Sequence, residues 1–197
     1  MNEQKISRRQ QILETLALQL EQTPGQTITT AQLAKAVGVS EAALYRHFAS
    51  KAKMYDALIE FIEDSVFTLI NRIMEEEKSA IIRCEKILTM ILAFSQKNPG
   101  LTRLLMGDIL TGETERLRRR IDKFFERLET QLKQILREGE ASNELAKSNL
   151  VPSQASLLVS VVQGRIAQFV RSEFKSQPLE YWEQQWPMLR LALNSAG

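Results

Sequence analysis

The stretch "TTAQLAKAVGVSEAALYRHFASKAKMYDALI", residues 29–59, holds two short helical patterns separated by a small turn. Thr29 is placed to cap the first helix, with a glutamine three residues later to complete a capping box. Gly38 supplies the turn, because a residue without a Cβ accepts a positive φ. Leu44 and Phe48, four residues apart, share the inward face of the second helix. This spacing predicts a helix-turn-helix whose second helix faces outward, toward a DNA major groove.

The outward side of this motif carries residue types that contact DNA. Small alanines let the helix backbone approach the groove and let a methyl group meet thymine methyl groups. Tyrosine, histidine, arginine, lysine and hydroxyl side chains near helix starts supply phosphate donors. The predicted DNA-binding residues are Thr29, Thr30, Ser40, Ala42, Ala43, Tyr45, Arg46, His47 and Lys51. Taken singly, Tyr45 and His47 are more often ordinary surface residues, so the prediction depends on the whole set.

Composition and periodicity predict an all-α fold. The 197 residues are 44% hydrophobic and include only 8 Gly and 5 Pro, which favours long helices over a turn-rich β architecture. Helical periodicity predicts about nine helices. Their expected ranges are 7–21, 30–37, 41–48, 51–76, 80–96, 101–110, 113–139, 153–175 and 178–194. The polar stretch at residues 139–153 is expected to be a mobile loop or an exposed elbow.

Charge is distributed unevenly along the chain. Residues 1–53 hold seven Lys and Arg against four acidic residues, a surplus of three in a chain whose net charge is +2, so the remainder carries −1. A basic head on a slightly acidic body suits contact with a polyanion at one end. The basic run "RLRRR" at 116–120 is interleaved with acids such as Glu113 and Asp122, so we expect a solvated mixed-charge face there.

Several function classes have no support in the sequence. One cysteine, Cys84, and one histidine leave no disulfide and no zinc site. No nucleophile is paired with a base and no phosphate loop appears, so we expect neither an enzyme nor a cofactor or metal. The apolar runs are too short for a signal peptide or a membrane span, and we expect a cytoplasmic protein.

Residues 29–59 resemble the DNA-binding signature of TetR-family regulators, in which "L-Y-x-H-F-x-S-K" ends the recognition helix and opens a long connecting helix. The resemblance implies a three-helix head, residues 1–53, joined to a helical dimerisation and regulatory body, residues 54–197. It also implies a homodimer on palindromic double-stranded DNA, with one or two dimers per site left open. Most members of the family respond to a small ligand, so a ligand-responsive transcriptional repressor is one reading of the function.

The whole chain resembles a narrower group of that family, the nucleoid occlusion factors of γ-proteobacteria. The resemblance is carried by "VGVSEAALYRHF", "ALIEFIEDS", "NPGLTRLL", "FERLETQLKQILRE", "FVRSEFK" and a Trp-Pro pair, spread over residues 37–187. It implies a nucleoid-associated protein that binds chromosomal palindromes and inhibits assembly of the tubulin-like division protein FtsZ over the nucleoid, which blocks septation there.

The same resemblance implies a groove for the C-terminal tail of FtsZ, between the helices at 51–76 and 80–96. The matching residues are Phe61, Leu69, Met90, Ala93 and Lys97. The aromatic ring would anchor an apolar side chain, and the lysine would meet acidic ones. Leu69 stands where the group has a basic residue, with Arg72 nearby, and Lys97 stands where arginine is usual. Packing in the protomer core is the alternative role of Phe61.

The helix at 153–175 is apolar over a wide arc, which favours two buried faces, one inward and one against a partner. The predicted dimer-interface residues are Leu158, Val161, Val162, Gly164, Ile166 and Phe169.

Overall fold

The computed structural model describes residues 7–110 and 115–193. Within those residues it contains nine helices and no strand, so the predicted all-α class is confirmed. The helices are α1 (Arg8–Gln22), α2 (Thr30–Val37), α3 (Glu41–His47), α4 (Lys51–Glu76), α5 (Ala80–Lys97), α6 (Pro99–Met106), α7 (Glu115–Ala141), α8 (Val151–Arg171) and α9 (Trp182–Leu193). The predicted helix start at Glu113 and the predicted helix end at residue 194 lie outside the described residues.

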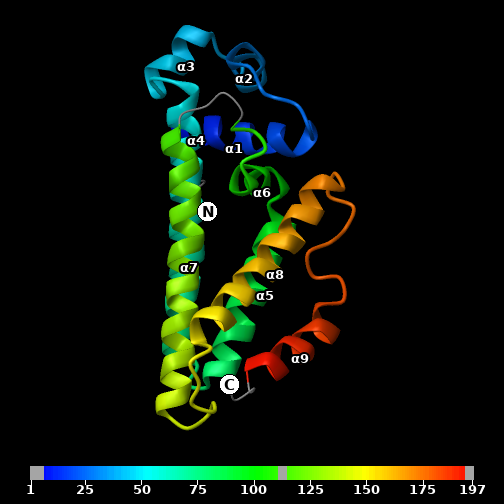
Figure 1. Ribbon diagram of the computed structural model, residues 1–197. Helices are drawn as coiled ribbons and strands as arrows, with labels where there is room; N and C mark the ends of the chain where they lie inside the picture. Colours follow the sequence, from blue (N-terminus) through cyan, green and yellow to red (C-terminus); the bar gives the residue numbers. More distant parts are fainter. Residues whose placement is uncertain (1–6, 111–114, 194–197) are drawn as a thin grey trace, which may run out of the picture.

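Helices α1, α2 and α3 form a head at one end of an elongated molecule (Figure 1). Ile12, Leu16 and Leu20 repeat along one face of α1 and are fully buried. They share the hydrophobic core with Leu33 of α2 and Leu44 of α3. Each of these short helices is marginal by itself, so their stability depends on this shared core.

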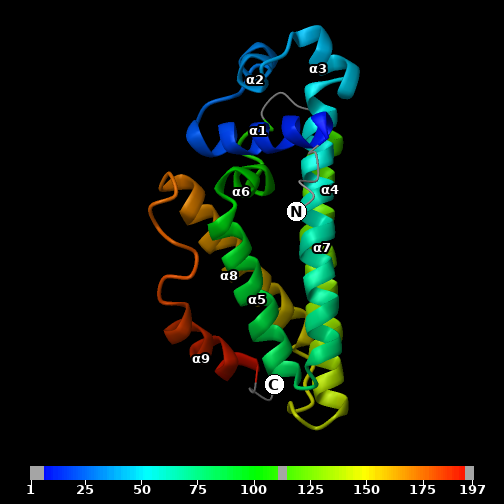
Figure 2. The same cartoon turned by 180° about the vertical axis from the view of Figure 1, so that it is seen from behind.

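Helix α4 connects the head to the body. It begins beside α3 and runs the length of the molecule next to α7, which runs in the same direction (Figures 1 and 2). Phe67 of α4 meets Phe124 of α7 edge-on, with ring centroids 5.5 Å apart, and the Arg127 guanidinium lies 3.6 Å from the centroid of the Phe67 ring. Within the described part of the chain, no helix is both long enough and apolar enough to cross a membrane.

The boundaries of three helices, α6, α8 and α9, differ most from the sequence prediction. Helix α6 begins at Pro99, since proline suits the first turn, and ends before Gly107, which has a φ of 72°. Helix α8 covers 151–171 instead of 153–175, and α9 begins at Trp182 instead of residue 178. The Trp182 indole donates a 2.7 Å hydrogen bond to Thr89, which attaches α9 to α5.

The elbow between α7 and α8, predicted as a mobile loop or an exposed elbow, is attached to α5. Leu145 is buried, and the Glu144 carboxylate accepts hydrogen bonds from the Ala80 and Ile81 amides at 2.6 and 3.1 Å and from the Ser79 hydroxyl. Burial raises the pKa of Glu144, but these donors and the charge of Arg83 outweigh burial and hold that pKa below its ordinary value. The elbow therefore caps a helix that lies far from it in sequence.

Candidate nucleic-acid interface

The turn between α2 and α3 has the predicted local structure. The Thr29 hydroxyl accepts a hydrogen bond from the Gln32 amide, and the Gln32 side chain accepts one from the Thr29 amide, so the capping box is complete. Gly38 has a φ of 76°, and the Ser40 hydroxyl caps α3 by accepting from the Ala43 amide. These contacts set the angle at which α3 leaves α2.

None of the nine predicted DNA-binding residues is buried. Thr29, Ser40, Ala42, Tyr45, Arg46 and His47 are exposed, and Thr30, Ala43 and Lys51 are half-buried. Leu44 and Phe48 face inward, which leaves the Tyr45 ring 44% exposed. Thr29 and Ser40 cap α2 and α3, and the other seven residues lie on α2, α3 and the start of α4. In Figure 1, α2 and α3 lie at the end of the head that is farthest from the body. The contact of the nine residues with DNA stays a prediction.

Two of the predicted hydroxyl donors are already engaged within the head. The Thr29 hydroxyl donates to the Gln32 side chain at 3.0 Å, and the Thr30 hydroxyl donates to the Glu41 carboxylate at 2.8 Å. The Thr30 contact joins the start of α2 to the start of α3. In this arrangement the two threonine hydroxyls align the helix starts.

Lys51 lies at the first position of α4, where Ser50 caps the helix by accepting from the Lys53 amide. The Lys51 ammonium is 5.4 Å from the centroid of the Tyr55 ring. A cation in the first turn is not stabilised by the helix dipole.

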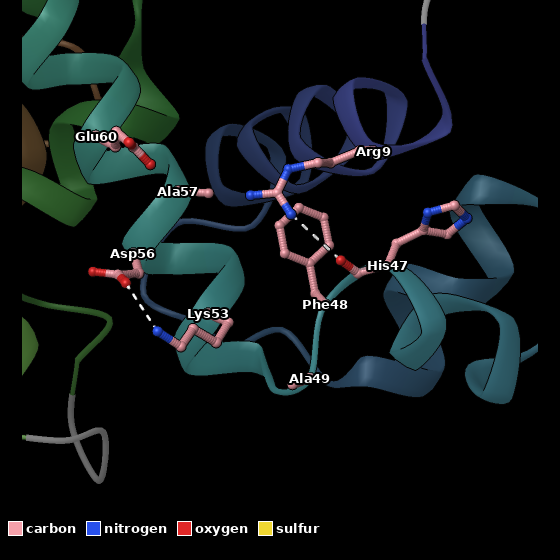
Figure 3. A pocket seen from close by; sticks show the side chains of 8 residues that line it. All are labelled: Arg9, His47, Phe48, Ala49, Lys53, Asp56, Ala57 and Glu60. Carbon is pink, nitrogen blue, oxygen red and sulfur yellow. Dashed lines mark hydrogen bonds and ion pairs between the residues drawn. The ribbon is translucent and has the colours of Figure 1, made fainter.

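A cleft of about 360 Å³, lined by both charged and apolar side chains, lies between the start of α1 and the start of α4 (Figure 3). Arg9 lines this cleft, with its guanidinium 4.3 Å from the centroid of the Phe48 ring, and donates to the His47 carbonyl at 3.4 Å. The His47 ring points away from the cleft in Figure 3. The sequence prediction did not include Arg9. Its contact with the end of α3 joins residues 38 positions apart, and helical periodicity does not predict such a distant contact.

Asp56 lies on the α4 side of the same cleft and pairs with cations from two helices. Its carboxylate is 2.7 Å from both Arg116 and Arg120 of α7 and 3.5 Å from Lys53. Burial raises the pKa of Asp56, but the hydrogen bonds and charges of the two arginines outweigh burial and lower it. The two arginine pairs join α7 to α4, so part of the positive charge of residues 116–120 is neutralised within the protein.

Of the five predicted groove residues, Phe61 lines a pocket that the head and the body share. Phe61 is 54% exposed and lines a pocket of about 370 Å³ together with Leu58 of α4. The opposite wall comes from α1, and the pocket is completed at the junction of α5 and α6. The further lining residues, which sequence reasoning missed, are Gln10, Leu13, Glu14, Ala17, Asn98 and Leu101.

The other four predicted groove residues do not line this pocket. Leu69 is 40% exposed on α4, Lys97 is exposed at the end of α5, and Met90 and Ala93 are half-buried. Of the missed α1 residues, Leu13 and Ala17 pack against the core, whereas Gln10 and Glu14 are polar. Periodicity could not predict which residues face these α1 side chains across the pocket, because those residues belong to other elements.

Four of the six predicted dimer-interface residues are buried inside the protomer instead. Leu158, Val162, Ile166 and Phe169 are at most 1% exposed, because α8 packs against α5, α6 and α7. Val161 is half-buried and Gly164 is exposed. Together with the 43% exposed Leu157, these two form the apolar part of the outward face of α8.

Comparison with known proteins defines the class. Residues 12–58 match the model of the bacterial regulatory proteins of the tetR family, and residues 78–194 match a tetracyclin repressor-like C-terminal domain. A TetR transcription regulator from Haloarcula marismortui superposes with a TM-score of 0.79 at 18% identity, over 95% of this chain and 98% of that one. FadR from Bacillus subtilis, solved with stearoyl-CoA, gives 0.72 at 17% identity, over 91% and 96%. The fold is thus that of a TetR-family regulator, as predicted.

Sequence identity is much higher to one group within the class. The chain is 55% identical to the nucleoid occlusion factor SlmA of Marinomonas sp. (strain MWYL1), over 98% of this chain and all of the relative. It is also 55% identical to that of Shewanella denitrificans, over 96% of both chains. This chain belongs to the family of the nucleoid occlusion factor SlmA.

Proposed function

We propose that this protein binds chromosomal palindromes as a homodimer and, while bound to DNA, inhibits FtsZ assembly over the nucleoid, which blocks septum formation there. Residues 1–53 read the DNA, and residues 54–197 hold the dimer contact and the surface for the FtsZ tail. The protein acts in the cytoplasm on the nucleoid. High identity to nucleoid occlusion factors over nearly the whole chain supports this proposal.

The DNA-binding part is supported by the head. Its predicted contact residues are all exposed or half-buried, and Leu44 and Phe48 point into the core between them. A cation begins α4 beside the recognition helix. Exposed cations and amides at helix starts are the groups that hold DNA phosphates.

The observation that carries the FtsZ part is the position of Phe61. Phe61 is a large aromatic side chain that is 54% exposed and lines a pocket, and this combination supports a contact surface there. Its ring lines an apolar pocket, and Lys97 is exposed next to Asn98, which lines the same pocket. A mainly apolar pocket with an exposed aromatic ring suits the apolar side chains of a short peptide.

The pocket also connects the two activities. Leu13 and Ala17 of α1 form one of its walls, and α1 belongs to the DNA-binding head (Figure 2). A tail segment seated against Phe61 therefore touches the helix that supports the recognition helix.

Sedimentation of FtsZ polymers tests the proposal. The protein is added with and without a palindromic duplex, and polymer should be lost only when the duplex is present. Phe61→Ala should weaken this effect roughly tenfold to a hundredfold while DNA binding is kept, because aromatic anchors dominate such contacts. Ile82→Ala, which also removes an exposed apolar side chain from the body, is the matched control. Unchanged polymer in every mixture, with release of the duplex by a metabolite, would favour a ligand-responsive repressor.

A further inference from the structure

Helices α1 and α6 meet at a close-packed joint between the head and the body. A Cβ on Gly100 of α6 would lie 2.0 Å from the Ala17 carbonyl oxygen of α1, so the two backbones touch at a distance that only glycine allows. Figure 2 shows α6 directly beneath α1, at the end of α5.

Arg103 of α6 is the polar centre of this joint. Its side chain is 2% exposed, and its guanidinium donates to the Leu20 and Thr23 carbonyls of the α1 end at 2.8 and 2.7 Å. It also donates to the Gln26 carbonyl at 3.1 Å and to the Asp108 carboxylate at 2.9 Å. A buried guanidinium with these four acceptors holds α1 and the following loop at a fixed angle, because leaving any of them unpaired is costly.

This joint is the second of two attachments of the head. Helix α4 is continuous from the head into the body, but one helix leaves the head free to rotate about that helix. The contact between α1 and α6 removes this freedom. The core that α1 shares with α3, together with the 3.4 Å hydrogen bond from Arg9 to the last carbonyl of α3, passes a rotation of α1 to the recognition helix.

Small rotations matter on the scale of DNA. With 15 residues, α1 is about 22 Å long, so turning it by about 5° about its C-terminal end moves its N-terminal end by about 2 Å. In a two-fold dimer both heads move, which changes their separation by about 4 Å, whereas successive base pairs are about 3.4 Å apart.

We propose that Arg103 is a positioning residue for DNA reading, which sets the half-site spacing that the dimer accepts. The proposal rests on the proposed binding of palindromic DNA by a homodimer. Arg103 acts through α1 and not on the bases, so its loss changes which spacing is bound and leaves the half-site sequence unchanged.

Selection from a randomised duplex library tests this proposal with the full-length protein. Arg103→Lys keeps the charge but removes the fork that bonds several carbonyls at once. Gly100→Ala separates the same helices in another way, because its Cβ pushes the Ala17 carbonyl of α1 away from α6. Arg83→Lys is the matched control, because Arg83 is also nearly buried and donates to the Met74 and Glu77 carbonyls, at the body end of α4.

Wild type should enrich one palindrome and discriminate against a one-base-pair insertion at its centre by at least about tenfold. With Arg103→Lys or Gly100→Ala the half-sites should stay the same, and this discrimination should fall to about threefold or less. Arg83→Lys should keep the wild-type ratio even if it lowers stability. A folded Arg103→Lys protein with the wild-type ratio would overturn the proposal. Failure of wild type to enrich any palindrome would instead refute the proposed function.

Discussion

Tyr45, Arg46 and His47 are consecutive in α3 and all three are exposed, while the residues on both sides of them, Leu44 and Phe48, are buried. At the scale of single residues, this alternation orients the recognition helix, because two apolar side chains four residues apart must face the core together. The polar residues between them then face outward.

Lys51→Ala is the sharpest test of a phosphate contact. Binding to specific and non-specific duplexes should weaken to a similar extent, and the slope of log affinity against log salt should fall by about 1, because one phosphate contact is lost. Fluorescence anisotropy over a salt series measures both quantities. Lys78→Ala, which removes an exposed cation at the far end of the molecule, should leave the slope unchanged. An unchanged slope with Lys51→Ala would remove Lys51 from the interface.

Thr29→Ala should also weaken binding to all sequences, but the structure gives it a second effect. The substitution removes the capping box of α2, which costs about 1 kcal/mol of stability. Lys51→Ala is therefore the cleaner of the two substitutions.

At the scale of elements, capping groups come from distant parts of the chain. Glu144 in the elbow after α7 accepts the first amides of α5, although 64 residues separate Glu144 from Ala80. Arg103 bonds the end of α1 across 83 residues. Such contacts fix neighbouring helices relative to one another. If one element moves away, backbone groups at the end of the other helix lose their hydrogen-bond partners.

Glu144→Ala should lower the unfolding temperature at pH 7 by about 2–4 °C, because a lost helix cap costs about 1 kcal/mol. The pKa of Glu144 is lowered in the folded protein, so its contribution is present above the ordinary glutamate pKa and is lost as the pH falls through the lowered value. The difference from wild type should therefore shrink below about pH 4. Circular dichroism at both pH values measures it, with the exposed Glu173→Gln as control. A difference that persists in acid would contradict the capping role.

At the scale of the whole molecule, α8 contributes to two kinds of surface. Leu158, Val162 and Ile166 fill the core of the protomer, whereas Leu157 and Val161 reach the outer face. We propose that this outer face meets the partner in the homodimer. Two copies of the head then approach the DNA together, at a separation that the joint between α1 and α6 controls.

Leu157→Glu should weaken dimerisation by about a hundredfold, because a carboxylate buried between partners costs several kcal/mol. Sedimentation velocity measures the change, and DNA affinity should fall with it, since a monomer holds one half-site. Folding should be kept, because Leu157 is 43% exposed in the protomer. Thr130→Glu on the exposed side of α7 is the matched control and should remain dimeric. A dimeric Leu157→Glu protein would exclude the outer face of α8 as the contact.

The sequence by itself determined the helix-turn-helix. Thr29 and Gln32 form the predicted capping box, Gly38 has the predicted positive φ, and Leu44 and Phe48 are buried as expected. The capping box and the turn depend on neighbours at most five residues away, and helical periodicity places Leu44 and Phe48 on one face of their helix, although α1 completes the core that buries them.

Only the tertiary structure decided which face of α8 is buried, that Arg9 and Arg103 hold the two ends of α1, and that Phe61 lines a pocket shared with the head. In each case the partner lies on another element, tens of residues away in the chain. An apolar stripe or a single arginine shows that a side chain needs a partner, but the packing of helices against one another decides which partner it has.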